Sequence, residues 1–174
     1  MLKKLGPKPY LFPMPVLLIA TYDENKRVDV MTAAWGGVYG EEKLAVDLDP
    51  HHKTFANIKL NKAFTISIAD IPHLKEADYL GIYSANRYPD KFERSGLAAA
   101  PSDVVAAPVL TELPITLECE VIYKQHLDEE TVPDFAKEWF YPADVTDIDA
   151  GGNCYYHDVY FGAIEASYII EQDE

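Results

Sequence analysis

The sequence predicts a mainly β protein with a few helices, arranged as an antiparallel barrel. Many short segments are apolar or alternate between apolar and polar residues, which is typical of strands. Few segments have helical spacing, and helices do not alternate regularly with strands, as a doubly wound parallel sheet would require. The length of 174 residues suits a single domain over residues 1–174.

The first predicted strands form a hairpin. Residues 16–22 are almost entirely apolar, as in a buried strand. The polar residues 23–26 predict a turn, and residues 27–35 a return strand. After the hairpin we expect a loop, because glycine recurs there at Gly36, Gly37 and Gly40.

The next predicted elements alternate between strand and helix. Residues 43–48 alternate as a strand with one buried face, and they lead into a helix in which Phe55 and Ile58 share a face. Residues 63–68 alternate as a further strand, and residues 73–84 have the spacing of a second helix.

The second half of the chain is expected to supply the central and closing strands of the barrel. A connector begins at residue 98, and residues 113–127 form a long, partly alternating segment that predicts a central strand. Residues 155–170 predict the closing strand. Alternate positions of the central segment carry apolar or aromatic residues, namely Ile115, Leu117, Cys119, Val121 and Tyr123.

Two segments lie outside this pattern. Residues 1–14 contain several prolines and are expected to form an arm that packs on the barrel. Residues 128–152 form an acidic insert in which Lys137 is the single basic residue. Apolar and aromatic side chains are expected to dock both segments on the body of the protein, namely Tyr10, Leu11 and Phe12 in the arm and Phe135, Trp139, Phe140 and Tyr141 in the insert.

The strand-to-helix corner after residue 48 has an unusual charge pattern. Asp49 is the expected N-cap of the helix, and Pro50 its first residue. From His51 to Ala69 there is no acidic residue, while Lys53, Lys59 and Lys62 are basic. Helix N-termini offer unpaired N–H groups to anions, so the corner predicts a phosphate site. The alternative is an ordinary capped helix with solvated lysines.

Composition excludes several classes of function. A net charge of −14 disfavours binding to nucleic acid and to anionic membrane surfaces. No apolar run approaches the ~18 residues of a membrane span, and prolines interrupt the N-terminal region where a signal peptide would lie. The cysteines Cys119 and Cys154 indicate reduced thiols, so we expect a cytoplasmic protein. The histidines lack metal-ligand spacing, and no nucleophilic serine motif occurs.

Four segments, in their order and spacing, carry a resemblance to a known family. They are Val-Met-Thr-Ala-Ala-Trp at residues 30–35, the corner at residues 49–58, residues 84–93, and residues 157–165. Together they resemble the flavin reductase family, which has an FMN-binding split β-barrel, and most closely its flavoredoxin branch. The resemblance runs from about residue 15 to residue 170 with one interruption.

The resemblance implies a set of cofactor-binding residues. The phosphate of FMN would meet the corner and the segment after the second helix, at His52, Lys53, Thr54, Ser84, Ala85, Asn86 and Lys91. The flavin ring would lie against the backbone of Met31, Thr32, Ala33 and Ala34. Asp29 departs from the family, which usually has asparagine there, and a carboxylate facing the ring would disfavour its anionic reduced form.

His157 matches the histidine before the family's final strand, where a nicotinamide would stack on the flavin, so the resemblance implies a catalytic role for it. An imidazole there could donate a hydrogen bond or a proton, because its pKa lies near neutrality. The alternative interpretation is a surface histidine at the end of a strand.

The resemblance implies an FMN-dependent oxidoreductase. It would take hydride from NADH or NADPH and pass electrons to free flavin, a ferric chelate or a protein. The alternatives are an FMN-holding electron carrier reduced by a partner protein, and a barrel that has lost its cofactor and serves as a structural dimer. A homodimer whose flavin sites borrow residues from both chains is also implied.

Overall fold

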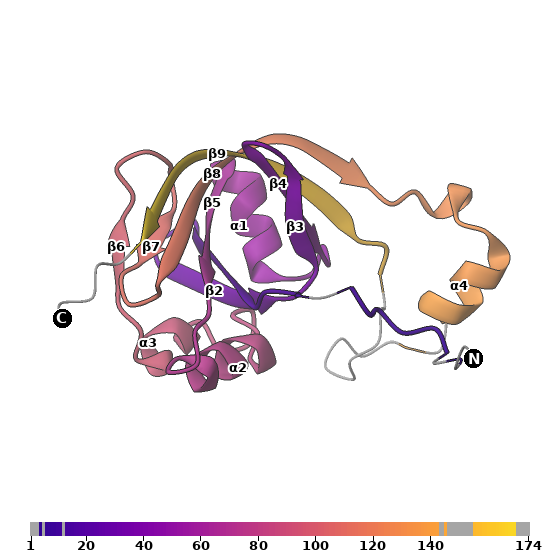
Figure 1. Cartoon of the computed structure of the whole chain (residues 1–174), viewed down its shortest axis with the longest axis horizontal. Helices are drawn as coiled ribbons and strands as arrows, with labels where there is room; N and C mark the ends of the chain where they lie inside the picture. Colours follow the sequence, from indigo (N-terminus) through magenta and orange to yellow (C-terminus); the bar gives the residue numbers. More distant parts are fainter. Residues whose placement is uncertain (1–3, 5, 12, 143–144, 146–154, 170–174) are drawn as a thin grey trace.

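The structure is a computed structural model that describes residues 4, 6–11, 13–142, 145 and 155–169. Its main feature is a strongly curved seven-stranded sheet in the order β2-β1-β5-β8-β9-β4-β3 (Figure 1). All neighbouring strands in it are antiparallel. The end strands β2 and β3 are not paired with each other in the described part of the chain, so the sheet curls without closing. The predicted mainly β fold with a few helices is confirmed.

The large sheet contains β1 (Leu17–Tyr22), β2 (Val28–Ala33), β3 (Gly36–Gly40), β4 (Lys43–Leu48), β5 (Ala63–Ile68), β8 (Ile115–His126) and β9 (Asp158–Ile169). A two-stranded sheet contains β6 (Ala99–Pro101) and β7 (Pro108–Leu110). The helices are α1 (Lys53–Asn61), α2 (Leu74–Ile82), α3 (Lys91–Ser95), α4 (Asp134–Phe140) and the 3-10 helix η1 (Glu129–Thr131).

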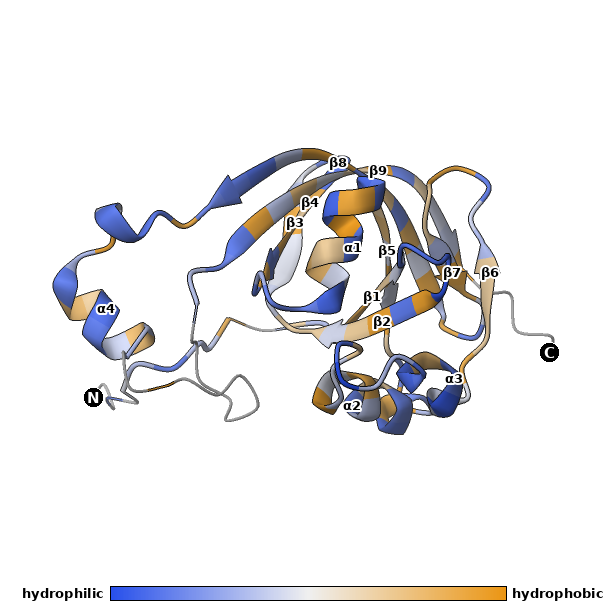
Figure 2. Cartoon of the chain, turned by 180° about the vertical axis from the view of Figure 1, so that it is seen from behind, coloured by the Kyte–Doolittle hydropathy of each residue, from blue (hydrophilic) through white to orange (hydrophobic). Residues whose placement is uncertain are grey.

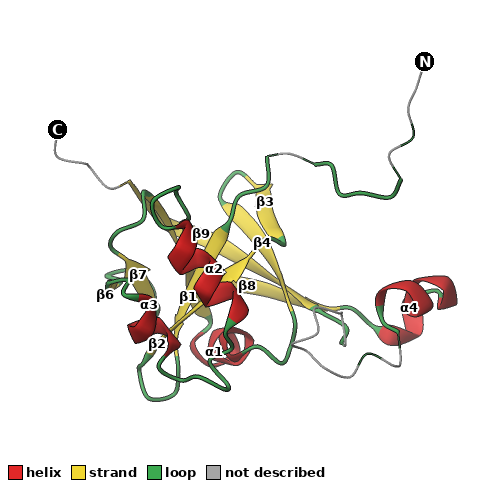
Figure 3. Cartoon of the chain, turned by 90° about the horizontal axis from the view of Figure 1, so that it is seen from below, coloured by secondary structure: helices red, strands yellow, loops and turns green. Residues whose placement is uncertain are grey.

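Strand β1 contacts a hydrophobic cluster on each side, which explains why its sequence is almost continuously apolar. Its successive side chains point to opposite faces of the sheet. Leu17 and Ile19 join the cluster inside the curl of the sheet, with Phe55 and Ile58 of α1. Leu18 joins the cluster on the other face, beneath α2 and α3. Figure 3 shows α2 and α3 in front of the strands, and both helices contact β2.

Helix α1 begins later than the sequence predicts. Residues 49–52 form a turn, and the helix starts at Lys53, so the assignment of Asp49 as N-cap and Pro50 as first helical residue is wrong. The Asp49 carboxylate instead accepts a hydrogen bond from the backbone N–H of His51 at 2.8 Å. The prediction that Phe55 and Ile58 share a buried face is confirmed.

The predicted glycine loop is wrong, because residues 36–40 form the edge strand β3. Gly36 is required there by close packing. A Cβ atom at this position would lie 2.9 Å from Leu17 Cδ1 and 3.0 Å from the carbonyl oxygen of Ala45. The glycine therefore marks the close approach of neighbouring strands and not a break in the sheet.

Strand β8 is central, as predicted, since it pairs with both β5 and β9. The expected burial pattern along it is only partly correct. Ile115 is exposed, while Thr116 and Glu118 are buried. The β8–β9 register shifts between residues 118 and 119 and again between residues 121 and 123. Leu117, Cys119 and Val121 face the cluster inside the curl of the sheet, as expected. Thr116 and Glu118 are buried on the opposite face, where Thr116 Oγ1 lies 2.7 Å from Ser67 Oγ, so the strand is covered on both sides.

The insert and the arm do not dock as predicted. Helix α4 lies away from the body of the sheet and carries both hydrophilic and hydrophobic residues (Figure 2). Phe135 and Trp139 are 73% and 72% exposed, Phe140 is also exposed, and Tyr141 stacks on Tyr156. In the arm, Tyr10 and Leu11 are exposed, and Phe12 lies outside the described residues. Residues 143–144 and 146–152 of the insert also lie outside them.

Candidate functional site

A cleft of about 820 Å³ lies where β2, the start of α1 and the segment after α2 meet. This volume is within the usual range of small-molecule sites. The cleft is lined by Asp29, Met31, Thr32, His51, His52, Lys53, Thr54, Leu80, Gly81, Ile82, Tyr83, Ser84, Ala85, Asn86, Arg87, Lys91 and Tyr155. The structure therefore brings together most of the cofactor-binding residues expected from the sequence; the exceptions, Ala33 and Ala34, are not among the lining residues.

The start of α1 forms one end of the cleft and has no side-chain cap. The N-cap residue His52 has extended backbone angles and makes no capping hydrogen bond with its side chain. The first turn contains no acidic residue. The first N–H groups of a helix have no partner within the helix, and its N-terminus attracts negative charge. This end of the cleft is therefore suited to an anion such as a phosphate.

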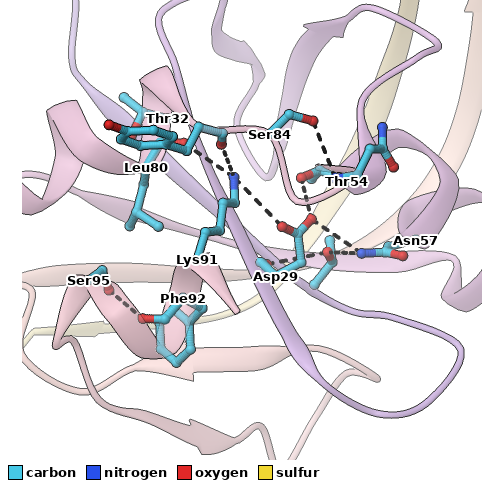
Figure 4. Close-up of polar contacts among 12 residues, drawn as sticks. Asp29, Thr32, Thr54, Asn57, Leu80, Ser84, Lys91, Phe92 and Ser95 are labelled. Atoms are coloured by element: carbon cyan, nitrogen blue, oxygen red, sulfur yellow. Dashed lines mark hydrogen bonds and ion pairs between the residues drawn. The ribbon is translucent and has the colours of Figure 1, made fainter. Parts of the chain in front are cut away.

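Beneath the cleft, Asp29 joins three segments of the chain (Figure 4). Its carboxylate is buried, with a residue exposure of 4%. Oδ2 accepts hydrogen bonds from Thr54 Oγ1 at 2.7 Å and from Asn57 Nδ2 at 3.3 Å. Oδ1 lies 3.8 Å from Lys91 Nζ. Asp29 thus lines the cleft, but its carboxylate oxygens accept hydrogen bonds from Thr54 and Asn57 of α1 and pair with Lys91.

Lys91 lies at the start of α3 and is 3% exposed. Its Nζ donates to the carbonyl oxygens of Leu80 at 3.3 Å and Tyr83 at 3.0 Å. Burial lowers the pKa of Lys91, and the nearby Asp29 carboxylate acts in the opposite direction. Lys91 therefore fixes the end of α2 against β2, and its charge is already compensated by Asp29.

Lys53 also lines the cleft and is more accessible than Lys91. Its Nζ donates to Glu24 Oε2 at 2.6 Å, and this bond lowers the pKa of the exposed Glu24 carboxyl. Exposed ion pairs contribute little because water and salt screen them. Lys53 could exchange Glu24 for a bound anion at small cost.

The segment after α2 is attached to the corner by Asn86. Asn86 Nδ2 donates to the carbonyl oxygen of His51 at 2.7 Å, and its backbone N–H donates to Ser84 Oγ at 3.3 Å. The expectation that these two segments meet in space is therefore correct. Thr54 contributes differently from the prediction, since its hydroxyl is buried against Asp29 and only its backbone belongs to the open helix end.

The other end of the cleft lies at the junction of β2 and the end of α2, which pack on each other. Met31 and Thr32 line it from the strand, and Leu80, Gly81 and Ile82 line it from the end of the helix. The Thr32 hydroxyl donates to the carbonyl oxygen of Ala77 at 2.5 Å, so it is committed to holding α2. This end offers an apolar wall and backbone groups to a flat ligand.

His157 lies beside this site but is not among the residues that line the cleft. Its Nδ1 is 3.1 Å from Asp47 Oδ1, and this hydrogen bond raises the pKa of His157 against the opposing effect of burial. For His52, burial is the main effect and lowers the pKa, and the charge of His157 lowers it further. The two imidazoles are therefore close enough to influence each other.

Eight lining residues are not among those that the sequence assigns to the site: Asp29, His51, Leu80, Gly81, Ile82, Tyr83, Arg87 and Tyr155. His51 stands in the corner next to His52, and Arg87 stands in the segment that carries the resemblance. Tyr155 has no signal in the sequence, because it follows the acidic insert and meets the cleft only through the fold. Among the described residues, no group of side chains is placed to hold a metal ion, and no helix is long and apolar enough to span a membrane.

An antiparallel sheet that curls without closing is the architecture of a split barrel, here with a cleft at an uncapped helix end. Residues 10–174 match the family model described as the flavin reductase like domain, and the chain belongs to this family. The structure is similar to flavoredoxin of Desulfovibrio vulgaris, with 29% identity, a TM-score of 0.75, and coverage of 98% of this chain and 78% of that one. It is also similar to flavoredoxin from Methanosarcina acetivorans, with 20% identity, a TM-score of 0.70, and coverage of 98% and 77%.

One curated relative is an uncharacterized protein from Aeropyrum pernix, which is 24% identical over 163 residues. The match covers 92% of this chain and 51% of the relative, so the chain spans about half the length of the curated relative that it matches.

Proposed function

We propose that the protein is an oxidoreductase that binds FMN in the cleft, accepts hydride from NADH or NADPH, and passes electrons to free flavin, a ferric chelate or a protein. The observation that carries this proposal is the uncapped start of α1, which faces a cleft of about 820 Å³ in a chain of the flavin reductase like family. Bound FMN would supply the hydride and electron chemistry itself, while the protein positions it.

The kinds of residue that line the cleft support the binding of FMN. The N–H groups of the first turn of α1, together with Lys53, would hold the phosphate. Met31 and Thr32 of β2, together with Gly81 and Ile82 at the end of α2, would border the ring. The Asp29–Lys91 pair holds these segments in place before the ligand arrives. The proposal requires a compartment that supplies reduced nicotinamide and keeps thiols such as Cys119 reduced, which is the cytoplasm.

The proposal is tested by mixing FMN-loaded protein anaerobically with NADH and, separately, with NADPH. We expect the absorbance of the oxidised flavin to fall with at least one of them and to return when ferric chelate or free flavin is added. Flavin that stays oxidised with both nucleotides would exclude the hydride-accepting reductase. An electron carrier reduced by a partner protein would then be the better description.

His157→Ala is expected to slow flavin reduction by the nicotinamide by about 10-fold, with nearly unchanged FMN affinity, because the nicotinamide would be less well positioned. Stopped-flow reduction and an FMN titration on the same variant separate the two effects. Lost FMN binding with normal reduction of the loaded fraction would instead assign His157 to the cofactor site.

The pH dependence of this variant has a definite sign. The folded state raises the pKa of His157 above 6.5, so its pairing with Asp47 stabilises the fold fully below that value and is lost as pH rises through the elevated pKa. His157→Ala should therefore lower the melting temperature more at about pH 5.5 than at about pH 9.

A homodimer is also part of the proposal. Large apolar side chains are exposed on the edge strand β3 and on α4, among them Val38, Tyr39 and Trp139. Aromatic residues of this kind are enriched at interfaces. Analytical ultracentrifugation should give twice the mass of the chain. A stable monomer that retains FMN would contradict the expectation.

A further inference from the structure

Two aromatic rings lie stacked at the α1 end of the cleft. The rings of His51 and Tyr155 have centroids 3.4 Å apart and planes inclined by 27°. Both residues line the cleft, although they come from segments far apart in the chain: His51 from the turn before α1 and Tyr155 from the segment before β9. The pair is outside the set of residues that the family resemblance assigns to the cofactor.

Hydrogen bonds hold His51, on which Tyr155 stacks, in place. The backbone N–H of His51 donates to Asp49 Oδ1 at 2.8 Å, and its ring Nδ1 lies 3.0 Å from the same oxygen. Its carbonyl oxygen accepts the bond from Asn86 Nδ2 at 2.7 Å. Asp49 is itself buried. His51 is therefore held on its backbone and on its ring, and it offers Tyr155 a defined surface.

The position of the stack relative to the proposed cofactor follows from the order of the lining residues. His51 directly precedes His52 and Lys53, where α1 begins. A flavin whose ring lies at the junction of β2 and α2 and whose phosphate meets α1 would therefore point that phosphate toward the stack. An adenylate joined to this phosphate, as in FAD, would have to pass the Tyr155 ring.

We infer that Tyr155, held by His51, sets the choice of cofactor by excluding flavin dinucleotides from the cleft. The inference rests on the proposed function and deepens it. Selectivity of this kind comes from a steric obstacle to the wrong ligand and not from a better contact with the right one. Tyr155 then acts as a specificity-determining residue, and its effect depends on the ring and not on the phenol hydroxyl.

The test is the ratio of dissociation constants for FAD and FMN, measured by fluorescence titration of the apoprotein. Tyr155→Ala should lower this ratio by about 10-fold or more, since the obstacle is removed while the contacts to FMN remain. Tyr155→Phe keeps the ring and should keep the ratio of the unmodified protein. Tyr156→Ala is the matched control, because Tyr156 stacks on Tyr141 and does not line the cleft.

Each outcome decides the inference. An unchanged ratio in Tyr155→Ala would overturn it, and so would a higher ratio, which would make the ring a platform for adenine. Should Tyr155→Ala fold poorly by circular dichroism, His51→Ala removes the support of the ring and should shift the ratio in the same direction. Failure of the unmodified protein to bind any flavin would refute the proposed function itself, a result distinct from binding both flavins without selectivity.

Discussion

Asp29→Ala is expected to lower the free energy of unfolding by about 3–5 kcal/mol, because it leaves a buried lysine without its counter-charge. Lys91 Nζ would keep its bonds to the carbonyl oxygens of Leu80 and Tyr83 but lose the carboxylate at 3.8 Å. Thr54 Oγ1 and Asn57 Nδ2 would also lose an acceptor. Urea denaturation followed by circular dichroism measures the change.

The matched control for Asp29 is Asp90→Ala. Asp90 also pairs with a basic residue, Arg94, but its side chain is 64% exposed, so its removal should change stability by no more than about 0.5 kcal/mol. The double variant Asp29→Asn with Lys91→Met removes both buried charges. Its loss of unfolding free energy should be smaller than the sum of the losses in Asp29→Asn and Lys91→Met alone. Equal losses for Asp29→Ala and Asp90→Ala would contradict the buried-pair interpretation.

FMN should bind at least about 100-fold more tightly than riboflavin, which lacks the phosphate. Hydrogen bonds to charged groups contribute about 1.5–3 kcal/mol each, and a phosphate at the start of α1 would accept several of them. Two such bonds correspond to a factor of about 10²–10⁴ in affinity. Titration of the apoprotein with both flavins gives the ratio of their dissociation constants. Equal affinities would show that the phosphate does not bind at this end of the cleft.

Lys53→Ala should weaken FMN binding by about 1.5–3 kcal/mol and leave riboflavin binding unchanged. Lys59→Ala is the control, because Lys59 has the same charge on the same helix but is exposed in its last turn. Glu24→Ala should leave FMN affinity unchanged or increase it, since it frees Lys53 from its present partner. An equal loss in Lys53→Ala and Lys59→Ala would indicate a general charge effect.

The sequence predicts the order of the main elements well, because each has a regular pattern of apolar residues. The hairpin of β1 and β2 follows from a continuous apolar run and a polar turn, and β4, β5 and the buried residues Phe55 and Ile58 follow from periodicity. The prediction fails where packing replaces local pattern. Gly36 indicates a loop by composition but lies in β3, and the polar residues Thr116 and Glu118 of β8 are buried on the face opposite to its apolar residues.

For the candidate site too, the sequence predicts which segments take part but not the contacts of individual residues. The segments that form the cleft are recognisable in the sequence, since residues 30–35, 49–58 and 84–93, in their order and spacing, carry the family resemblance. The roles of individual residues within them are not. Lys91 is expected to meet a phosphate and is instead buried against Asp29, while Thr54 turns its hydroxyl to the same carboxylate.

By itself, the sequence determined that this chain forms an antiparallel sheet with a cationic strand-to-helix corner, because periodicity and the absence of acidic residues are properties of neighbouring positions. Only the tertiary structure decided how charges and rings pair. Asp29 meets Lys91, and His51 meets Tyr155, through segments far apart in the chain. Such pairs depend on the path of the backbone between them, and a buried charge gains its partner only when that path is fixed.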